Sequence, residues 1–372
     1  MKQLDCHVHF ADYRLTEGYL NMADALGYSG FNVVCTPHPT KLTLVPEALY
    51  LKSKRPDSVY VLGGLDIGGL FSHPQSVGAY FASCVDTLKA MGCDGIKMIE
   101  GKPDMKRNLR YPPFDAEVLD PYWAKVEAEG MPVLFHLNDP EEYWDAKRIP
   151  PEARAMGWYY GEGGFPNNED QYREVKNVLD RHPNLKIIFA HFLFFSADLP
   201  RMASWLDQYP NIGIDLTPGI EMYRNLSKDA DATKAFFEKY QDRIYFGTDI
   251  GVGEMFDTLN AVNIARNRER VDVVKRFLMD SEPHTLQAES FPTACGQTYI
   301  GLGLDETVSQ KIMANNFTKL VGDRPRAINR GAIIGECTRL LEVMKHIPPF
   351  VPDQPIDNSA IKAVKAYFER GV

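Results

Sequence analysis

The stretch DPYWAKVEAEGMPVLFHLN (residues 120–138) combines the two kinds of element that recur along the whole chain. Asp120 and Pro121 are typical of a helix start, and Gly130 is typical of a helix end. The run MPVLFHLN that follows is short and almost continuously apolar, as expected for a strand that is buried on both faces. The stretch therefore predicts a helix, with Asp120 as its N-cap, that leads directly into a parallel strand.

Apolar runs of this kind occur eight times. They are KQLDCHVHF (2–10), GFNVVCTP (30–37), VYVLGGLDI (59–67), CDGIKMIE (93–100), MPVLFHLN (131–138), LKIIFAHF (185–192), NIGIDLTP (211–218) and RIYFGTDIG (243–251). Helical patterns separate them: Val175, Val178 and Leu179 share a stripe that is expected to end at Pro183, and a second helix is expected to end at Pro210. Eight strands joined by helical crossovers predict an α/β fold, a (β/α)8 TIM barrel.

An open dinucleotide-binding sheet is the weaker alternative, because no glycine-rich phosphate motif follows the first strand. The barrel is predicted to occupy residues 1–324. Beyond the eighth strand the chain is expected to be helical: a helix in 305–323, a proline-rich connector IPPFVPDQP (347–355) and an amphipathic helix in 358–371. Residues 325–372 are therefore interpreted as a helical extension that serves packing or self-association, and not as a separate domain.

Composition narrows the class of partner. The formal net charge is −9 and the sequence has no dense run of Lys or Arg, which argues against a nucleic-acid or acidic-membrane partner. No apolar run approaches the roughly 20 residues that a membrane span needs, and the first strand begins before a cleavable signal would fit. Six cysteines without a Cys-x-x-Cys pair suit reduced thiols. We expect a cytoplasmic protein with a small-molecule substrate, and homo-oligomer formation stays open.

Ligand-type side chains lie at the ends of four predicted strands. His7 and His9 are in the first, His136 in the fifth, His191 in the sixth and Asp249 in the eighth. Each alone has a plain structural explanation. His7 and His9 could lie on the solvent-exposed face of an edge strand, His136 or His191 could be a core histidine bonded to a neighbouring backbone group, and Asp249 could cap the next segment. Because a barrel gathers its strand ends at one mouth, the five together instead indicate a shared site.

The order His-x-His, His, His, Asp on strands one, five, six and eight resembles the amidohydrolase superfamily. The segments DCHVHF, VLFHLND, IIFAHF, YFGTDIG and ANNFTKLVG are most similar to its amidohydrolase-2 branch, which includes aminocarboxymuconate-semialdehyde decarboxylase, related aromatic-acid decarboxylases and lactone hydrolases. The similarity runs from about residue 3 to about residue 322.

By position, the resemblance implies that one divalent cation is bound by His7, His9, His136 and Asp249, and that His191 is a catalytic proton-transfer residue. Asp249 would also orient the attacking water. Three neutral imidazoles and a carboxylate suit zinc, with manganese as the alternative.

Other residues are weaker candidates for binding substrate or metal. Lys97, in DGIKMIE, stands where other branches of the superfamily hold a second metal through a carboxylated lysine, and it would equally suit an anionic substrate; Glu100 is weaker still. The long segment after the fifth strand is a candidate lid whose Trp158, Tyr159 and Tyr160 either stack on substrate or pack within their own loop. Three residues that follow barrel strands are candidates to grip a carboxylate: Arg14, Tyr223 and Arg224.

Three functions remain open on the sequence. The leading hypothesis is a metal-dependent hydrolase acting on a small amide, ester or lactone. The alternative is a metal-dependent decarboxylase of an unsaturated or aromatic carboxylic acid, because the metal ligands are shared and only the pocket differs. The third is a barrel that binds a ligand without converting it, which the complete ligand set disfavours.

Overall fold

The computed structural model describes residues 1–38, 40–219, 221–252, 259–287, 296–347 and 356–371. All eight predicted strands are present. They are β1 (Leu4–Phe10), β2 (Gly30–Val34), β5 (Val59–Gly64), β6 (Gly95–Gly101), β7 (Val133–Leu137), β8 (Ile187–Phe189), β9 (Ile212–Asp215) and β10 (Ile244–Tyr245). They pair in parallel in the order of the chain, as crossover connections require.

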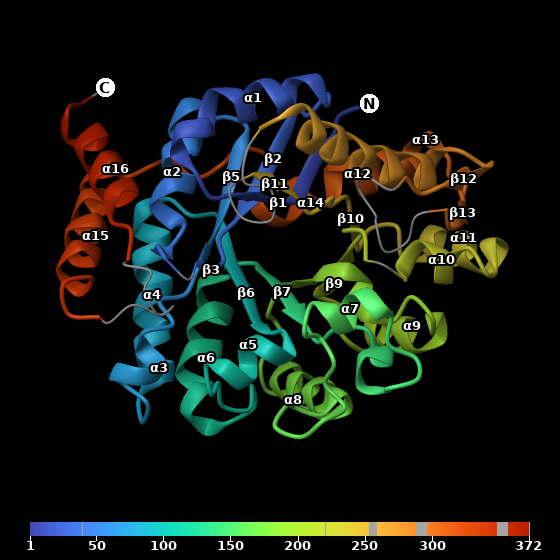
Figure 1. Cartoon of the computed structure of the whole chain (residues 1–372), viewed down its shortest axis with the longest axis horizontal. Coiled ribbons are helices and arrows are strands. Elements are labelled where there is room, and N and C mark those ends of the chain that lie inside the picture. The colour runs from blue at the N-terminus through green and yellow to red at the C-terminus, as the bar shows by residue number, and fades with distance from the viewer. Residues whose placement is uncertain (39, 220, 253–258, 288–295, 348–355, 372) are drawn as a thin grey trace.

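The sheet closes on itself through the segment that follows β10. The short strand β11 (Ile250–Val252) pairs in parallel with β1, and the Cys6 amide donates to the Phe246 carbonyl over 2.8 Å. The chain from β10 to β11 thus contacts β9 at one end and β1 at the other. The predicted (β/α)8 TIM barrel is confirmed, with strands inside and helices outside (Figure 1).

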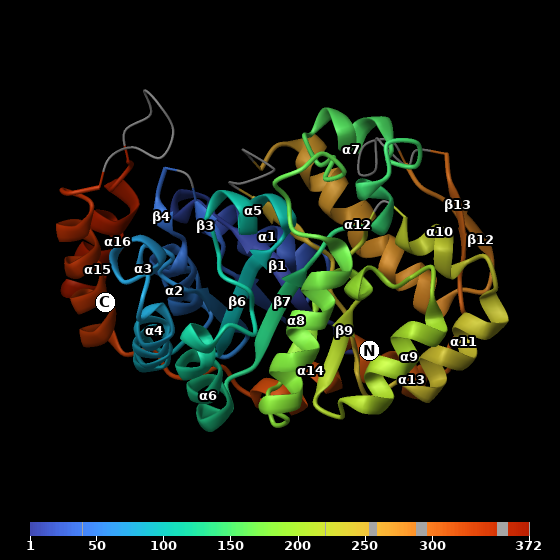
Figure 2. The same cartoon turned by 90° about the horizontal axis from the view of Figure 1, so that it is seen from below.

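Helices follow the strands and cover the outer face of the barrel (Figures 1 and 2). The longer ones up to the eighth strand are α1 (Thr16–Ala25), α2 (Val45–Lys54), α4 (Val77–Met91), α6 (Asp120–Glu129), α8 (Asn168–Arg181), α9 (Leu199–Gln208) and α11 (Ala230–Lys239). Four short helices lie between them: α3 (Gly69–Ser72), α5 (Pro103–Asn108), α7 (Pro151–Ala155) and α10 (Met222–Leu226). A hairpin of β3 (Pro37–His38) and β4 (Leu42–Thr43) precedes α2.

The local signals explain the helix ends, with one correction. Asp120 is the first residue of α6 and Leu119 precedes it, so the predicted N-cap at Asp120 is wrong; Gly130 ends α6 in the left-handed conformation, as predicted. Helix α8 begins after Asn167, whose side chain accepts from the Glu169 amide. It ends at Arg181, two residues before Pro183, since the residue before a proline avoids helical geometry.

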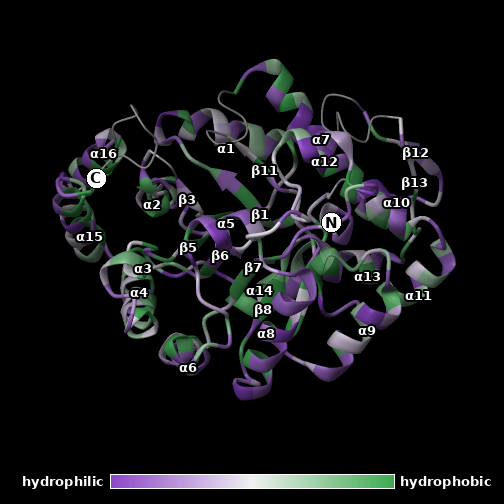
Figure 3. Cartoon of the chain, turned by 60° about the horizontal axis from the view of Figure 1, so that its bottom comes forward, coloured by the Kyte–Doolittle hydropathy of each residue, from purple (hydrophilic) through white to green (hydrophobic). Residues whose placement is uncertain are grey.

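Two apolar clusters pack the two faces of the barrel strands. One lies inside the barrel and joins side chains of the strands to the helical segment after the barrel; it includes Leu4, Cys6, Tyr60, Leu134, Ile188, Tyr245 and Phe317. The larger one lies between the strands and the outer helices. Helix α8 shows the division: Tyr172, Val175, Val178 and Leu179 are buried, while much of the helix is hydrophilic (Figure 3).

The region beyond the eighth strand is only partly helical, which corrects the prediction. It contains an antiparallel hairpin of β12 (Pro283–Thr285) and β13 (Thr298–Ile300), after the long helix α12 (Ala261–Met279). The helix predicted in 305–323 consists of α13 (Glu306–Gln310), a π-helical segment (Lys311–Asn315) and α14 (Asn316–Val321). Most of the predicted connector, residues 348–355, lies outside the described residues.

The last two helices are α15 (Arg330–Val343) and α16 (Ser359–Glu369). They pack on each other, and they also contact α4 and α2, respectively, at one end of the molecule (Figure 2). In the described part of the chain, no helix combines the length and apolar character that crossing a lipid bilayer requires.

Candidate metal centre

Strand β1 carries the two histidines that face the centre of the barrel mouth. It lies between β2 and β11, so the alternative of a wet edge strand is wrong. The residues His7 and His9 are 1% and 9% exposed, and their ring centroids lie 5.4 Å apart. The predicted shared orientation of the two rings is therefore confirmed.

The alternation along β1 is less regular than predicted. Leu4 and Cys6 belong to the cluster inside the barrel, whereas Val8 and Phe10 belong to the outer cluster. The change of face coincides with a register irregularity between β1 and β2, located between Asp5 and Val8. Such an irregularity turns side chains to a new direction, and it occurs here directly beside the histidines.

Asp249 completes a group of three ligand-type side chains. Its backbone amide donates to the His7 carbonyl over 2.9 Å, which fixes the residue against β1. The Asp249 Oδ1 atom lies 2.9 Å from His9 Nε2 and 3.6 Å from His7 Nε2. One ligand atom from each of the three residues lies within 4.8 Å of the other two, so the group fits a single cation.

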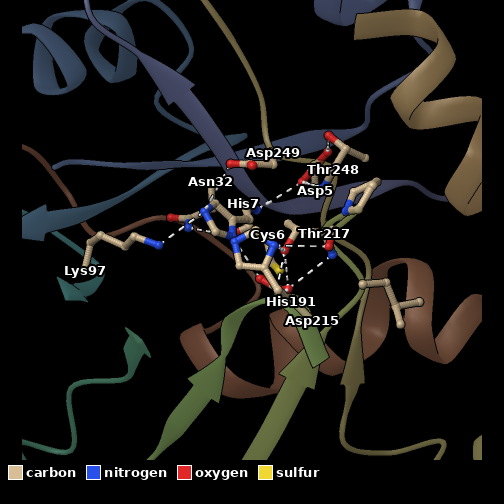
Figure 4. Close-up of polar contacts among 12 residues, drawn as sticks. Asp5, Cys6, His7, Asn32, Lys97, His191, Asp215, Thr217, Thr248 and Asp249 are labelled. Carbon is tan, nitrogen blue, oxygen red and sulfur yellow. Dashed lines mark hydrogen bonds and ion pairs between the residues drawn. The ribbon is translucent and has the colours of Figure 1, made fainter. Parts of the chain in front are cut away.

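Asp215, at the end of β9, holds His7 in place. Its Oδ2 lies 2.8 Å from His7 Nδ1, and its Oδ1 accepts from the His191 amide and from the Thr217 hydroxyl (Figure 4). Because a carboxylate at Nδ1 fixes the proton there, the Nε2 lone pair of His7 faces Asp249. Asp215 was not among the predicted site residues, although it ends β9 just as Asp249 follows β10.

Two further residues, Asp5 and Arg270, hold the segment around Asp249 in position. Asp5 accepts from the hydroxyls of Thr248 and Tyr28, each over 2.6 Å, and this fixes the residue before Asp249. Arg270 of α12 donates to the Thr248 carbonyl over 2.9 Å and lies 3.4 Å from Asp249 Oδ2. No strand-end signal marks Arg270, since it belongs to an outer helix.

His136 and His191 form a second pair beside this group. Their ring centroids are 4.9 Å apart, and the His191 ring lies 5.8 Å from that of His7. His136 Nε2 lies 3.4 Å from Asp139 Oδ1, and His136 is not among the residues whose ligand atoms lie within 4.8 Å of one another. His136 as a fourth metal ligand therefore stays a prediction.

The orientation of His191 is fixed by the chain after β9. His191 Nδ1 lies 3.2 Å from the Thr217 carbonyl oxygen, which only accepts hydrogen bonds. Nδ1 therefore carries the proton and the Nε2 lone pair is left to the site. The backbone of His191 is left-handed, with φ of 55°, and this unusual turn directs the ring to the mouth.

Burial and charge shift the pKa values of the group. Burial, together with the nearby Lys97 charge, lowers the pKa of His7 to about 4, and burial beside His136 lowers the pKa of His191 to about 4. Burial alone would raise the pKa of Asp249, but the hydrogen bond to His9 and the charge of His7 lower it well below its usual range. Neutral imidazoles beside a carboxylate are the forms that ligate a metal.

Lys97 points into the site from β6. The Lys97 side chain is buried, and its Nζ lies 3.2 Å from His7 Nε2 (Figure 4). Burial lowers the pKa of Lys97 to about 8, although the charges of Asp215 and Asp249 act in the opposite direction. Glu100, three residues later on β6, is also buried, and burial raises its pKa to about 7.

The other predicted substrate-binding residues lie at different places in the structure and are not gathered around His7. Arg14 is exposed and pairs with Asp12, and the buried Tyr223 hydroxyl donates to the Leu216 carbonyl. Trp158 and Tyr160 belong to a separate apolar cluster of the segment after β7, as one of the two alternatives had it. The Tyr160 hydroxyl donates to Asp139 over 2.6 Å, and Arg224 lines a cavity.

Solved structures share the fold at low sequence identity. An uncharacterized TIM-barrel protein from Bordetella bronchiseptica aligns with a TM-score of 0.53 and 12% identity, over 87% of this chain and 99% of that one. A 4-oxalomesaconate hydratase from Rhodopseudomonas palustris aligns with a TM-score of 0.50 and 11% identity, over 92% of this chain and all of the other. The comparison with curated proteins finds none that matches.

The family comparison is more specific than the fold. Residues 64–322, more than half of the chain, match the model of the amidohydrolase-2 family, described as amidohydrolase. Members of this family are metal-dependent enzymes. The donor set found here, two imidazoles and a carboxylate within reach of one cation, fits such a metal. The chain therefore belongs to the amidohydrolase-2 family.

Proposed function

We propose that the chain is a metal-dependent hydrolase acting on a small amide, ester or lactone. The observation that carries the proposal is the position of His191, a histidine whose tautomer is fixed by a carbonyl and whose ring lies 5.8 Å from the ring of His7. A proton acceptor beside a metal centre is what activation of water requires.

The divalent cation would be held by His7, His9 and Asp249, with His136 as the proposed fourth ligand and zinc or manganese as the metal. When bound, such a cation supplies Lewis-acid chemistry, which polarises a carbonyl oxygen and lowers the pKa of water. Asp215 keeps the Nε2 lone pair of His7 directed at the cation site through the hydrogen bond at Nδ1.

His191 would accept the proton of the attacking water at Nε2 and later donate it to the leaving group. The Thr217 carbonyl favours this, because it holds the Nδ1 proton and stabilises the imidazolium that forms. Phe194 stacks against the His191 ring with centroids 5.3 Å apart, which restricts water on that side of the imidazole.

A metal-dependent decarboxylase of an unsaturated or aromatic carboxylic acid is the second candidate. The observation that favours it is Lys97, a buried cation 3.2 Å from His7 Nε2, which would pair with a substrate carboxylate at the metal centre. In that reaction His191 would protonate carbon instead of the leaving group.

The two candidates are distinguished by their products. We would load the full chain with zinc or manganese and incubate it with a panel of amides, esters, lactones and unsaturated or aromatic acids. Acid release without carbon dioxide supports the hydrolase, whereas carbon dioxide release without net hydrolysis contradicts it and supports the decarboxylase. Absence of both products across the panel, with metal bound, contradicts both.

A further inference from the structure

Two adjoining cavities lie near the pair of His136 and His191, and Phe194 links the inner cavity to that pair. The inner one has a volume of about 70 Å³, and its lining includes Phe194, whose ring lies 5.3 Å from that of His191 and 5.5 Å from that of His136. The outer one has a volume of about 250 Å³. The two share four lining residues: Glu142, Arg148, Ala197 and Asn225. The shared lining places the two cavities side by side, and Phe194 links the lining of the inner one to the two histidine rings.

The outer cavity is lined mainly by cations. Arg148, Arg224 and Lys228 stand against a single carboxylate, Glu142. Arg148 already pairs with Glu141 over 2.8 Å, and Lys228 donates to the Asn225 amide oxygen over 2.8 Å. No ion pair joins Arg224 or Lys228 to another described residue, so the charge of both is available to a ligand.

The inner cavity contains a buried carboxyl group without a partner. Glu221 is 5% exposed, lines this cavity, and its Oε1 has no hydrogen bond within the described structure. Burial raises the pKa of Glu221 to about 7, with the charges of Glu142 and Asp139 adding to the effect and Arg224 opposing it. A buried polar atom without a partner is costly, so a ligand group that forms a hydrogen bond with Glu221 Oε1 would bind favourably.

We propose that these cavities bind the end of the substrate remote from the reacting bond, and that this end carries a carboxylate, received by Arg224 and Lys228, and a hydroxyl group, received by Glu221. The substrate is thus a small organic acid whose carboxylate lies beyond the amide, ester or lactone group. This inference rests on the proposed function for the identity of the reacting end, but binding at the remote end is independent of it.

The separation of charges supports the assignment. A carboxylate at Arg224 and Lys228 forms charge-assisted hydrogen bonds at the outer cavity, where cations exceed carboxylates. The inner cavity is lined by the carboxyl groups of Glu141, Glu142, Asp198 and Glu221 and by the cations of Arg148 and Arg201, so cations are not in excess there. The arrangement therefore favours a substrate carboxylate in the outer cavity, with the reacting end of the substrate toward His191.

The test measures binding of dicarboxylate probes to the full, metal-loaded chain by calorimetry. The probes are the unbranched dicarboxylates from malonate to adipate, the neutral glutaramide, and 3-hydroxyglutarate. At least one dicarboxylate is expected to bind about tenfold or more tightly than glutaramide, as a charge-assisted contact provides. Failure of every dicarboxylate to bind overturns the proposal.

Variants locate the contact. The double variant R224Q/K228Q is expected to weaken dicarboxylate binding about tenfold or more, whereas R173Q, which removes an exposed arginine of α8 outside both cavities, leaves it unchanged. Equal effects of the two variants overturn the assignment.

The hydroxyl of 3-hydroxyglutarate should improve binding over glutarate in the unmodified chain but not in E221L, and an equal gain in both contradicts the role of Glu221.

The binding data also separate this inference from the proposed function. Dicarboxylate binding without release of acid from any ester, amide or lactone leaves the inference standing and contradicts the hydrolase. Turnover of neutral lactones or amides without dicarboxylate binding contradicts the inference and leaves the hydrolase standing.

Discussion

His191 shows how much of the proposed chemistry depends on single residues held by their neighbours. Four consecutive residues, 191–194, have left-handed backbone angles, and His191 is fixed at its amide by Asp215 and at Nδ1 by Thr217. Left-handed geometry is costly for residues other than glycine, and it persists where the surroundings impose it. The cost of this left-handed turn is consistent with a site whose chemistry depends on the direction of the His191 ring.

Replacing His191 by Asn should lower turnover roughly 10²–10⁴-fold and leave the metal in place, because the variant loses the proton acceptor but keeps His7, His9 and Asp249. Steady-state kinetics and metal analysis of the purified variant check this. His182→Asn is the matched control, since His182 pairs with Glu127 after α8. Full turnover would make His191 a bystander, and loss of metal would make it a ligand.

Replacing Asp215 by Asn should weaken metal binding roughly 10–100-fold, because the carboxylate that fixes the tautomer of His7 is removed while its shape is kept. A competition titration against a chelator measures the affinity. Asp170→Asn, at an exposed carboxylate of α8, serves as the comparison. An unchanged affinity in the Asp215 variant would show that His7 needs no such support.

At the scale of elements, strand β6 places a buried acid, Glu100, behind the site. Its pKa is raised to about 7 by burial, from a usual value of 4.5. A carboxyl whose folded pKa is raised stabilises the fold fully below its unfolded pKa, and this contribution is lost as pH rises through the folded value. The relevant window therefore runs from about pH 4.5 to slightly above pH 7.

The change Glu100→Gln should remove this dependence. Between about pH 4.5 and pH 8, the unfolding free energy of the unmodified chain should fall by about 3 kcal/mol relative to the variant, which is the pKa shift expressed as energy. Urea unfolding at several pH values gives the difference. If that difference stays constant across the window, the Glu100 carboxyl does not titrate as described.

The segment after β7 is a second element with a testable role. Its aromatic residues form their own cluster, and the Tyr160 hydroxyl fastens that cluster to Asp139, three residues after His136. Tyr160→Phe should speed proteolytic cleavage of residues 139–167 by about tenfold, the effect of losing one hydrogen bond to a carboxylate. Tyr159→Phe is the control, and equal cleavage of both variants would show that the hydroxyl does not hold the segment.

The elements also show what the sequence can predict. All eight strands and the approach of His7, His9 and Asp249 follow from apolar runs and strand-end positions. Asp215 also stands at a strand end, so the same rule would have marked it as a candidate. The irregularity in β1, the turn at His191 and the contact of Arg270 depend on pairing between distant segments, which local patterns do not encode.

On the scale of the whole molecule, we propose that residues 325–372 are an extension of the barrel and not a separate domain. We base this on the packing of α15 and α16 against each other and against α4 and α2, and on Asp94, whose carboxylate accepts from Lys52 and from the Arg326 amide. The first residues after α14 are thereby fixed to the barrel. Among the described residues, none of the side chains gathered around His7 comes from this extension.

The closed barrel brings β1 and the segment after β10 together, and we propose that they hold one divalent ion. Anomalous diffraction at the metal edge, from crystals of the metal-loaded chain, is the measurement that tests this. We expect one peak per chain, bounded by His7, His9 and Asp249. Two peaks bridged by a modified Lys97, or a peak bounded by other side chains, would contradict the claim.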